Sequence, residues 1–137
     1  MTPDFLGALI THLAATSAIT ALVSTRIYGQ ELPDSEIAAM PRKTLMLRWA
    51  GGAGGLYRNL SVWRVDVWHY GETPFEAGVL HRTVHDVLKH LSREVSAGVL
   101  LHALEESGGP LPIREPDTHW PVVVQAWLLY AADVGVP

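Results

Sequence analysis

The chain has 137 residues, of which 48% are hydrophobic and 18% charged, a balance typical of a globular protein and not of a disordered one. It contains no cysteine, which excludes disulfide bonds and thiolate metal sites. With a net charge of −4, the chain as a whole lacks the basic field expected of a nucleic-acid binder. The length fits one core, so we expect residues 1–137 to form a single domain.

The N-terminal residues predict two consecutive helices. Thr2-Pro3-Asp4 is typical of a helix start, with a hydroxyl at the N-cap, then proline and an acid in the first turn. Apolar residues recur at helical spacing, and a break at Thr16 or Ser17 precedes the second, shorter helix. The run from Leu6 to Val23 approaches the length of a membrane span. Because polar residues interrupt it and no basic segment precedes it, we expect no signal peptide and no membrane partner.

Two strands are predicted after an aperiodic segment that runs from Arg26 to Met40. The first strand runs from Lys43 to Trp49 and the second from Arg58 to Tyr70. The second strand has one apolar and one mixed face, which is typical of an antiparallel sheet covered mainly on one side. Gly51–Tyr57 is expected to be a flexible hairpin tip, since it lacks the Lys-Ser or Lys-Thr of a phosphate-binding loop.

A second long helix is predicted from Thr73, because Thr73-Pro74 and Glu76 form a capping box. Its apolar stripe extends to Val95, and Gly98 is expected to stop it. Two further strands, Val99 to Glu105 and Pro121 to Ala131, flank a long proline-rich loop, Ser107 to Trp120. This order predicts an α+β fold: an antiparallel sheet of about four strands, with helices packed on one face.

Patterns that indicate catalysis or metal binding are weak. His81 and His85 lie four residues apart on the predicted helix, but a zinc site needs three or four ligands, and Arg82 stands where a zincin needs glutamate. No serine lies in a Gly-x-Ser-x-Gly elbow. We therefore expect no enzyme, no catalytic residues, no cofactor and no metal. A small metal-dependent hydrolase that uses His81, His85 and one distant carboxylate stays open as a less favoured alternative.

Residues suited to partner contacts concentrate around the first predicted hairpin. Trp68 shares a strand face with Arg64 and Asp66, and tryptophan and arginine dominate interface energetics. The alternative is that a local loop covers Trp68. Five basic residues in or beside the hairpin could form a basic stripe that meets an acidic partner, solvent or nucleic acid: Arg42, Lys43, Arg48, Arg58 and Arg64. The predicted partner interface comprises Gly52, Gly54, Tyr57, Arg48, Arg64, Asp66 and Trp68.

Several short motifs occur in a characteristic order along the chain. A short helix ending in Ala21-Leu22-Val23 leads to Arg26-Ile27-Tyr28, followed by Leu32-Pro33, Pro41, the strand Trp63–Trp68 and a helix that opens with Glu76-Ala77. This order, firmest from Ala18 to Leu91, resembles the tail terminator, or tail completion, proteins of long-tailed bacteriophages. The proline-rich loop Ser107–Trp120 departs from that pattern.

The resemblance implies a structural virion protein without catalytic residues. Members of the family form a homo-hexameric ring that closes the head-proximal end of the tail tube and meets the neck or head-completion protein. A closed ring needs two different, complementary patches on each copy. The resemblance also implies synthesis in the host cytoplasm, a place in the virion and no sequence-specific nucleic-acid binding. Another neck or head-completion subunit, or a minor tail protein, is the nearest alternative.

Overall fold

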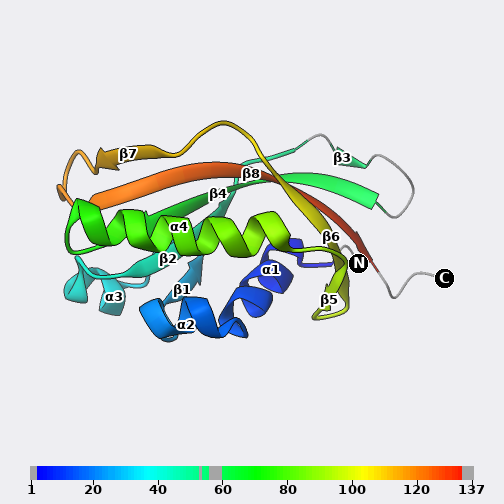
Figure 1. Cartoon of the computed structure of the whole chain (residues 1–137), viewed down its shortest axis with the longest axis horizontal. Helices are drawn as coiled ribbons and strands as arrows, with labels where there is room; N and C mark the ends of the chain where they lie inside the picture. Colours follow the sequence, from blue (N-terminus) through cyan, green and yellow to red (C-terminus); the bar gives the residue numbers. More distant parts are fainter. Residues whose placement is uncertain (1–2, 53, 56–59, 134–137) are drawn as a thin grey trace.

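The computed structural model describes residues 3–52, 54–55 and 60–133, which form four helices and eight strands (Figure 1). In chain order the elements are α1 (Phe5–Ala14), α2 (Ser17–Val23), β1 (Ile27–Gly29), α3 (Asp34–Ala39), β2 (Thr44–Trp49), β3 (Gly54–Gly55), β4 (Leu60–Tyr70), α4 (Pro74–His90), β5 (Glu94–Ser96), β6 (Val99–Glu106), β7 (Leu111–Arg114) and β8 (Pro121–Asp133). The strands form one curled sheet in the order β1-β2-β4-β8-β6-β5, with β3 beside β4 and β7 beside β8.

The predicted antiparallel sheet of about four strands, with helices on one face, is wrong. The sheet has eight strands, and it is mixed because β1 pairs in parallel with β2, with Ile27 opposite Leu45. Helix α3 lies in the crossover that a parallel pair requires. Its flanking residues Leu32 and Met40 pack against the sheet face opposite α1 and α4. The connection that contains α3 therefore helps to cover the second face of the sheet.

The N-cap of the first helix differs from the predicted one. The N-cap of α1 is Asp4, whose Oδ1 accepts a hydrogen bond of 2.8 Å from the backbone N–H of Gly7; Thr2 lies outside the described residues. The predicted break is confirmed, with Thr16 as the N-cap of α2. Among the described residues no single helix is long and apolar enough to cross a membrane; only α1 and α2 together reach that length and composition, and they are bent by 84°.

Helix α4 begins as predicted but ends earlier. The Thr73 hydroxyl accepts a hydrogen bond from the backbone N–H of Glu76, which confirms the cap. The helix ends at His90, because the chain then enters the β5–β6 hairpin. Ala97 and Gly98 form its turn with φ of 49° and 77°, the left-handed pair that matches the twist of a two-residue hairpin. Val95 is therefore not part of the helix stripe but lies on β5, 63% exposed.

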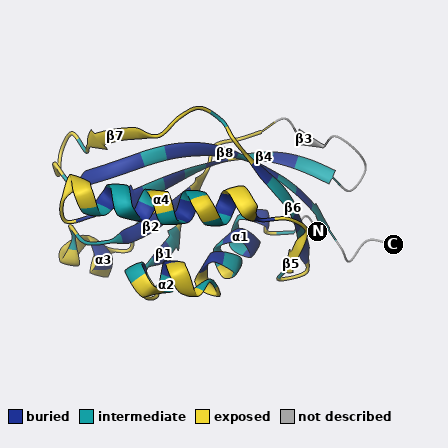
Figure 2. Ribbon diagram, in the orientation of Figure 1, coloured by how far each residue is buried: buried dark blue, intermediate teal, exposed yellow. Residues whose placement is uncertain are grey.

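The main core fills the concave side of the sheet, beneath α1, α2 and α4. Figure 2 shows the buried side of α4 turned toward β4 and β8. Helix residues at the spacing of one helix face meet inward residues of the central strands: Leu9, Leu13, Leu80, Val84 and Leu88 against Leu45, Val65, Val67, Trp127 and Leu129. Burial of these side chains is the main force that holds the helices on the sheet.

The predicted loop from Ser107 to Trp120 contains a strand. Strand β6 pairs with the second half of β8, and β7 pairs with its first half along the same edge. Between them the backbone N–H of Ser107 donates to the carbonyl oxygen of Ala126. Pro112 is tolerated in β7 because the strand lies at the sheet edge. As a result β8 has a neighbour on both sides along most of its length.

Candidate partner interface

The sheet face opposite α1 and α4, here the outer face, carries four of the seven predicted interface residues. Arg48 of β2 stands directly opposite Asp66 of β4. Arg64 and Trp68 lie two positions to either side of Asp66, so alternation places all four on this face. The structure thus brings these residues together, and their role in binding stays a prediction.

Charged side chains on the outer face pair loosely. Arg64 Nε lies 3.6 Å from Asp66 Oδ1, and half of the Arg64 side chain is exposed. Across the sheet the Tyr130 hydroxyl donates to Glu105 Oε2 over 2.6 Å, and this bond raises the pKa of the tyrosine. Exposed ion pairs contribute only about 0–1 kcal/mol to stability. The half-exposed Arg64 side chain can therefore exchange Asp66 for a partner on another molecule at small cost.

The predicted basic stripe does not form as proposed. Arg42 turns away to bind Glu36 with two hydrogen bonds, and Arg64 pairs with Asp66. Arg58 lies outside the described residues. Among the described residues, the outer face therefore carries charges of both signs and not a continuous basic band.

The remaining half of the outer face is apolar. The strand register places Met46, Trp68, Val124 and Leu111 in one row across β2, β4, β8 and β7. Trp68 is half-buried in this row, with its ring 6.5 Å from that of Tyr70, and Leu111 at the end of the row is 57% exposed. Trp68 is thus partly covered, and the row becomes more exposed toward β7.

The glycines of the predicted interface lie beside Arg64. Strand β3 places Gly54 opposite Val62, and the backbone N–H of Arg64 donates to the carbonyl oxygen of Gly51. Gly52 has a φ of 152°, and a Cβ there would lie 2.3 Å from the carbonyl oxygen of Val62. The seventh predicted residue, Tyr57, lies outside the described residues, as do residue 53 and the rest of 56–59.

Replacing Gly52 with alanine is expected to lower the free energy of unfolding by about 1–3 kcal/mol, because the Cβ meets backbone and the backbone geometry is strained. Gly109→Ala is the matched control, since a Cβ there meets open space and φ is not positive. Urea unfolding of both variants tests this. Equal stabilities would show that the hairpin adapts to the added methyl group without cost.

Comparison with known proteins gives a structural likeness. No protein-family model matches the sequence, and no curated protein matches it significantly. The fold resembles that of a virion chain. The similar chain belongs to a solved structure described as "Virion of native gene transfer agent (GTA) particle". The two chains superimpose with a TM-score of 0.67 at 16% sequence identity. The alignment covers 96% of this chain and 99% of the GTA virion chain, so the fold is shared over nearly the whole of both.

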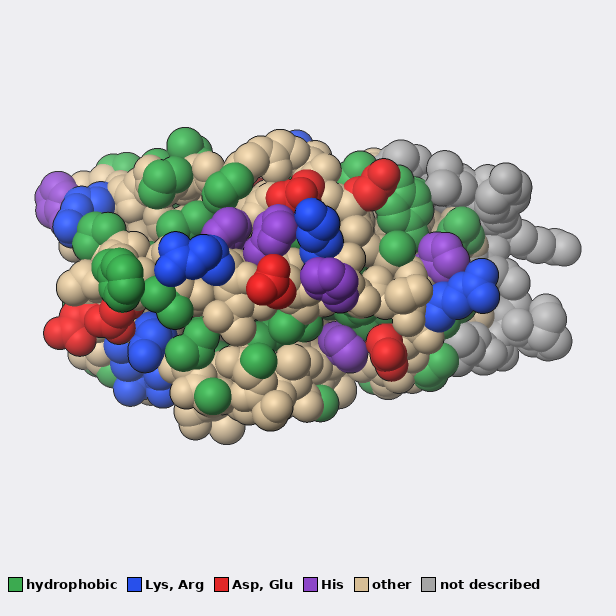
Figure 3. Space-filling model, viewed as in Figure 1, with side chains coloured by type: hydrophobic (Ala, Val, Ile, Leu, Met, Phe, Trp, Pro, Cys, Tyr) green, Lys and Arg blue, Asp and Glu red, His purple; other side chains and the backbone are tan. Residues whose placement is uncertain are grey.

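A polar cluster lies between α4 and the sheet. His81 Nε2 lies 2.6 Å from Gln125 Oε1, and Gln125 Nε2 donates to Glu106 Oε1 over 2.8 Å. His85 Nε2 lies 2.8 Å from the same carboxylate oxygen. The bonds from Gln125 and His85 lower the pKa of Glu106. Figure 3 shows histidines gathered over the middle of α4, on the face that carries this chain of hydrogen bonds.

His69 extends the cluster into the core. Its ring is fully buried and meets the ring of His81 edge-on at a centroid distance of 5.0 Å. Nδ1 lies 2.7 Å from the carbonyl oxygen of Val123, which only accepts, so Nδ1 carries the proton of the neutral ring. Burial lowers the pKa of His69 to about 3. The ring is therefore uncharged at neutral pH.

The cluster was not predictable in full from the sequence. The spacing of His81 and His85 was the one local signal, whereas Glu106 and Gln125 come from β6 and β8, 21 and 44 positions away from the histidines they contact. In the part of the chain that the structure describes, no three His, Asp or Glu side chains are arranged to hold a metal ion. The cluster of His81, His85, Glu106 and Gln125 therefore links α4 to the sheet by hydrogen bonds.

Proposed function

We propose that this chain is a structural subunit of a phage-like particle, forming a ring that ends the tail tube at its head-proximal end and joins it to the neck. The observation that carries the proposal is the likeness to the GTA virion chain over nearly all of both chains. The order of sequence motifs from Ala18 to Leu91, which resembles tail terminators, supports the finer assignment.

The proposed partners are further copies of the chain, the tail tube protein and a neck or head-completion protein. The outer face suits such contacts, because it combines an exposed ion pair with a half-buried tryptophan and an apolar row that ends at Leu111. Aromatic residues and arginine are the residue types enriched at interfaces.

We also propose that the chain acts without catalysis or a cofactor. The titratable side chains that lie together, His81, His85 and Glu106, bond to one another through Gln125 or directly. These side chains lie between α4 and the sheet, and their hydrogen bonds join the helix to β6 and β8. The metal-dependent hydrolase alternative therefore gains no support from the geometry.

Electron microscopy of particles assembled without this gene tests the function. We expect filled heads beside unjoined tails of uncontrolled length, and normal particles again when the gene is supplied in trans. Unjoined tails of normal length would overturn tail termination in favour of a neck protein. Normal particles without the gene would overturn the structural role altogether.

A further inference from the structure

The edges of the curled sheet carry two different apolar features. An aromatic groove lies beside β1, and exposed apolar side chains gather around β7. The strand order places β1 at one edge of the sheet and β7 at the other, beyond β8. Figure 1 shows β7 along the top of the molecule, away from α1 and β1 below.

We propose that in the ring the β7 patch of one copy, defined as Pro74, Phe75, Leu111, Pro112 and Ile113, seats in the groove beside β1 of the next copy. This inference rests on the proposed function, because it takes ring formation as given. It names the surfaces through which the ring closes.

The groove has a volume of about 700 Å³ and lies between the first turn of α1 and the ends of β1 and β2. Its walls include Phe5, Trp49 and Trp63, with the Trp63 ring 5.2 Å from Phe5 and 4.7 Å from Trp49. Trp49 is 52% exposed, although tryptophan gains most from burial. Asp4 is the only charged side chain among the described residues that line the groove.

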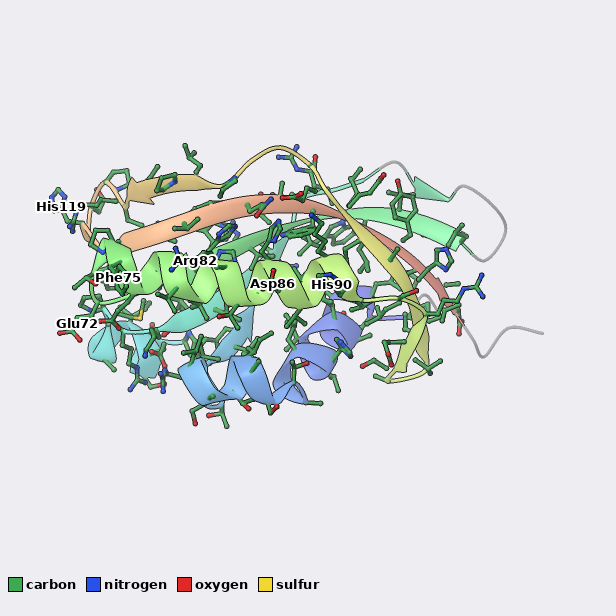
Figure 4. All side chains as sticks on the ribbon, viewed as in Figure 1. Glu72, Phe75, Arg82, Asp86, His90 and His119 are labelled. Atoms are coloured by element: carbon green, nitrogen blue, oxygen red, sulfur yellow. The ribbon has the colours of Figure 1, made fainter. Side chains whose placement is uncertain are left out.

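The β7 patch is the apolar complement to this groove. Phe75 is 75% exposed, Leu111 57% and Ile113 37%. Pro74 of α4 lines one shallow hollow together with Pro112 and Ile113 of β7, and Phe75 and Leu111 are the chain neighbours of these residues. Figure 4 shows Phe75 on the first turn of α4, at the same end of the molecule as His119 of the β7–β8 turn. Contiguous exposed apolar surface of this kind marks interaction sites.

Charge and backbone chemistry both favour this pairing. Arg114 is the only charged side chain among the described residues that line the hollow of the patch, and Asp4 is the only one among those that line the groove, so the proposed contact brings opposite charges together. Pro110 and Pro112 have no backbone N–H, so β7 is a poor template for adding a further strand. Docking of proline and apolar side chains against aromatic rings is a mode of contact known from proline-rich peptide recognition, and it needs no backbone N–H from β7.

A cross-linking experiment tests the contact directly, because the natural chain has no cysteine. Ile113→Cys and Gln30→Cys, both at exposed positions, are purified separately, mixed and treated with a short bismaleimide. Gln30 lines the groove. We expect a cross-linked dimer from the mixture, at least about tenfold more than from Glu94→Cys mixed with Gln30→Cys, because a formed contact raises the effective concentration. A chain that carries both cysteines should give a ladder of cross-linked oligomers.

A charge reversal supplies an independent readout. Arg114→Glu is expected to lower the fraction of rings seen by native mass spectrometry several-fold. Arg82→Glu, on an exposed part of α4, is the matched control and should leave that fraction unchanged.

The outcomes separate the two proposals. Rings that form without preferential cross-linking between positions 113 and 30 would overturn the contact and leave the proposed function standing. A chain that stays monomeric at every concentration, in solution and on tail tubes, would overturn the ring and this contact together.

Discussion

Acidification from pH 7 to pH 4 is expected to lower the free energy of unfolding by about 3 kcal/mol through His69 alone. Burial holds the pKa of the folded histidine at about 3, below its ordinary value of 6.5. Between these values the unfolded chain binds a proton that the folded chain excludes. The stability is therefore complete above pH 6.5 and is lost as the pH falls toward 3. His81 and His85 on α4 face the same region, together with Glu106 of β6.

Urea unfolding at pH 4, 5.5 and 7.5 measures this effect. His69→Leu removes the titrating group. The free energy of unfolding of this variant should therefore change less steeply with pH than that of the natural chain, by an amount that corresponds to nearly one bound proton. The variant is expected to lose about 1–3 kcal/mol at neutral pH, because the carbonyl oxygen of Val123 loses its donor. His90→Leu is the exposed control on α4. A pH profile of His69→Leu parallel to that of the natural chain would place the acid sensitivity elsewhere.

The second large effect is expected from Glu36→Ala, which should lower the free energy of unfolding by about 3 kcal/mol. The Glu36 side chain is 1% exposed and accepts two hydrogen bonds from Arg42, at 2.7 and 2.8 Å. Tyr28 and Thr44 donate to the same carboxylate. The variant leaves these donors without their acceptor. Because Arg42 is 42% exposed and reaches water, we place the loss at the low end for a buried pair.

Asp34→Ala provides the control, since Asp34 is an exposed acid in the first turn of the same short helix. The hydrogen bonds from Arg42 lower the pKa of Glu36 below 4.5, so this contribution is present above pH 4.5 and is lost as the pH falls. The difference between Glu36→Ala and the natural chain should therefore shrink at pH 3. A loss equal to that of Asp34→Ala at neutral pH would mean that the carboxylate is not needed to hold α3 on the sheet.

Local signals in the sequence predicted the elements that they specify directly. The capping residues Thr73 and Glu76 located the start of α4, and alternation from Trp63 to Trp68 located β4 and its two faces. Strand alternation also accounts for Glu105 and Glu106, which point to opposite faces, one toward Tyr130 and the other toward His85. Such patterns depend on neighbours a few positions away, so they can be read without knowing the fold.

The errors arose where distant pairing decides the structure. Strand β1 has three residues and pairs with β2 across the α3 crossover, and no local pattern in Arg26–Met40 indicates it. Strand β7 was missed because Pro112 suggests a loop, although an edge strand tolerates proline. The candidate site divides in the same way. The shared face of Arg64 and Trp68 follows from alternation, whereas the approach of Gln125 to His81 follows only from the folded sheet.

The central place of β8 has a consequence for how the protein is made. Strands β4 and β6 both pair with β8, yet β8 follows every other described strand in the chain. The nascent polypeptide can form its helices and the β2–β4 hairpin early, but the sheet cannot close until residues 121–133 have left the ribosome. Until then the inward apolar side of β4 is exposed to chaperones and to other unfinished chains. Premature termination within β8 should therefore yield insoluble chains and not a slightly weakened subunit.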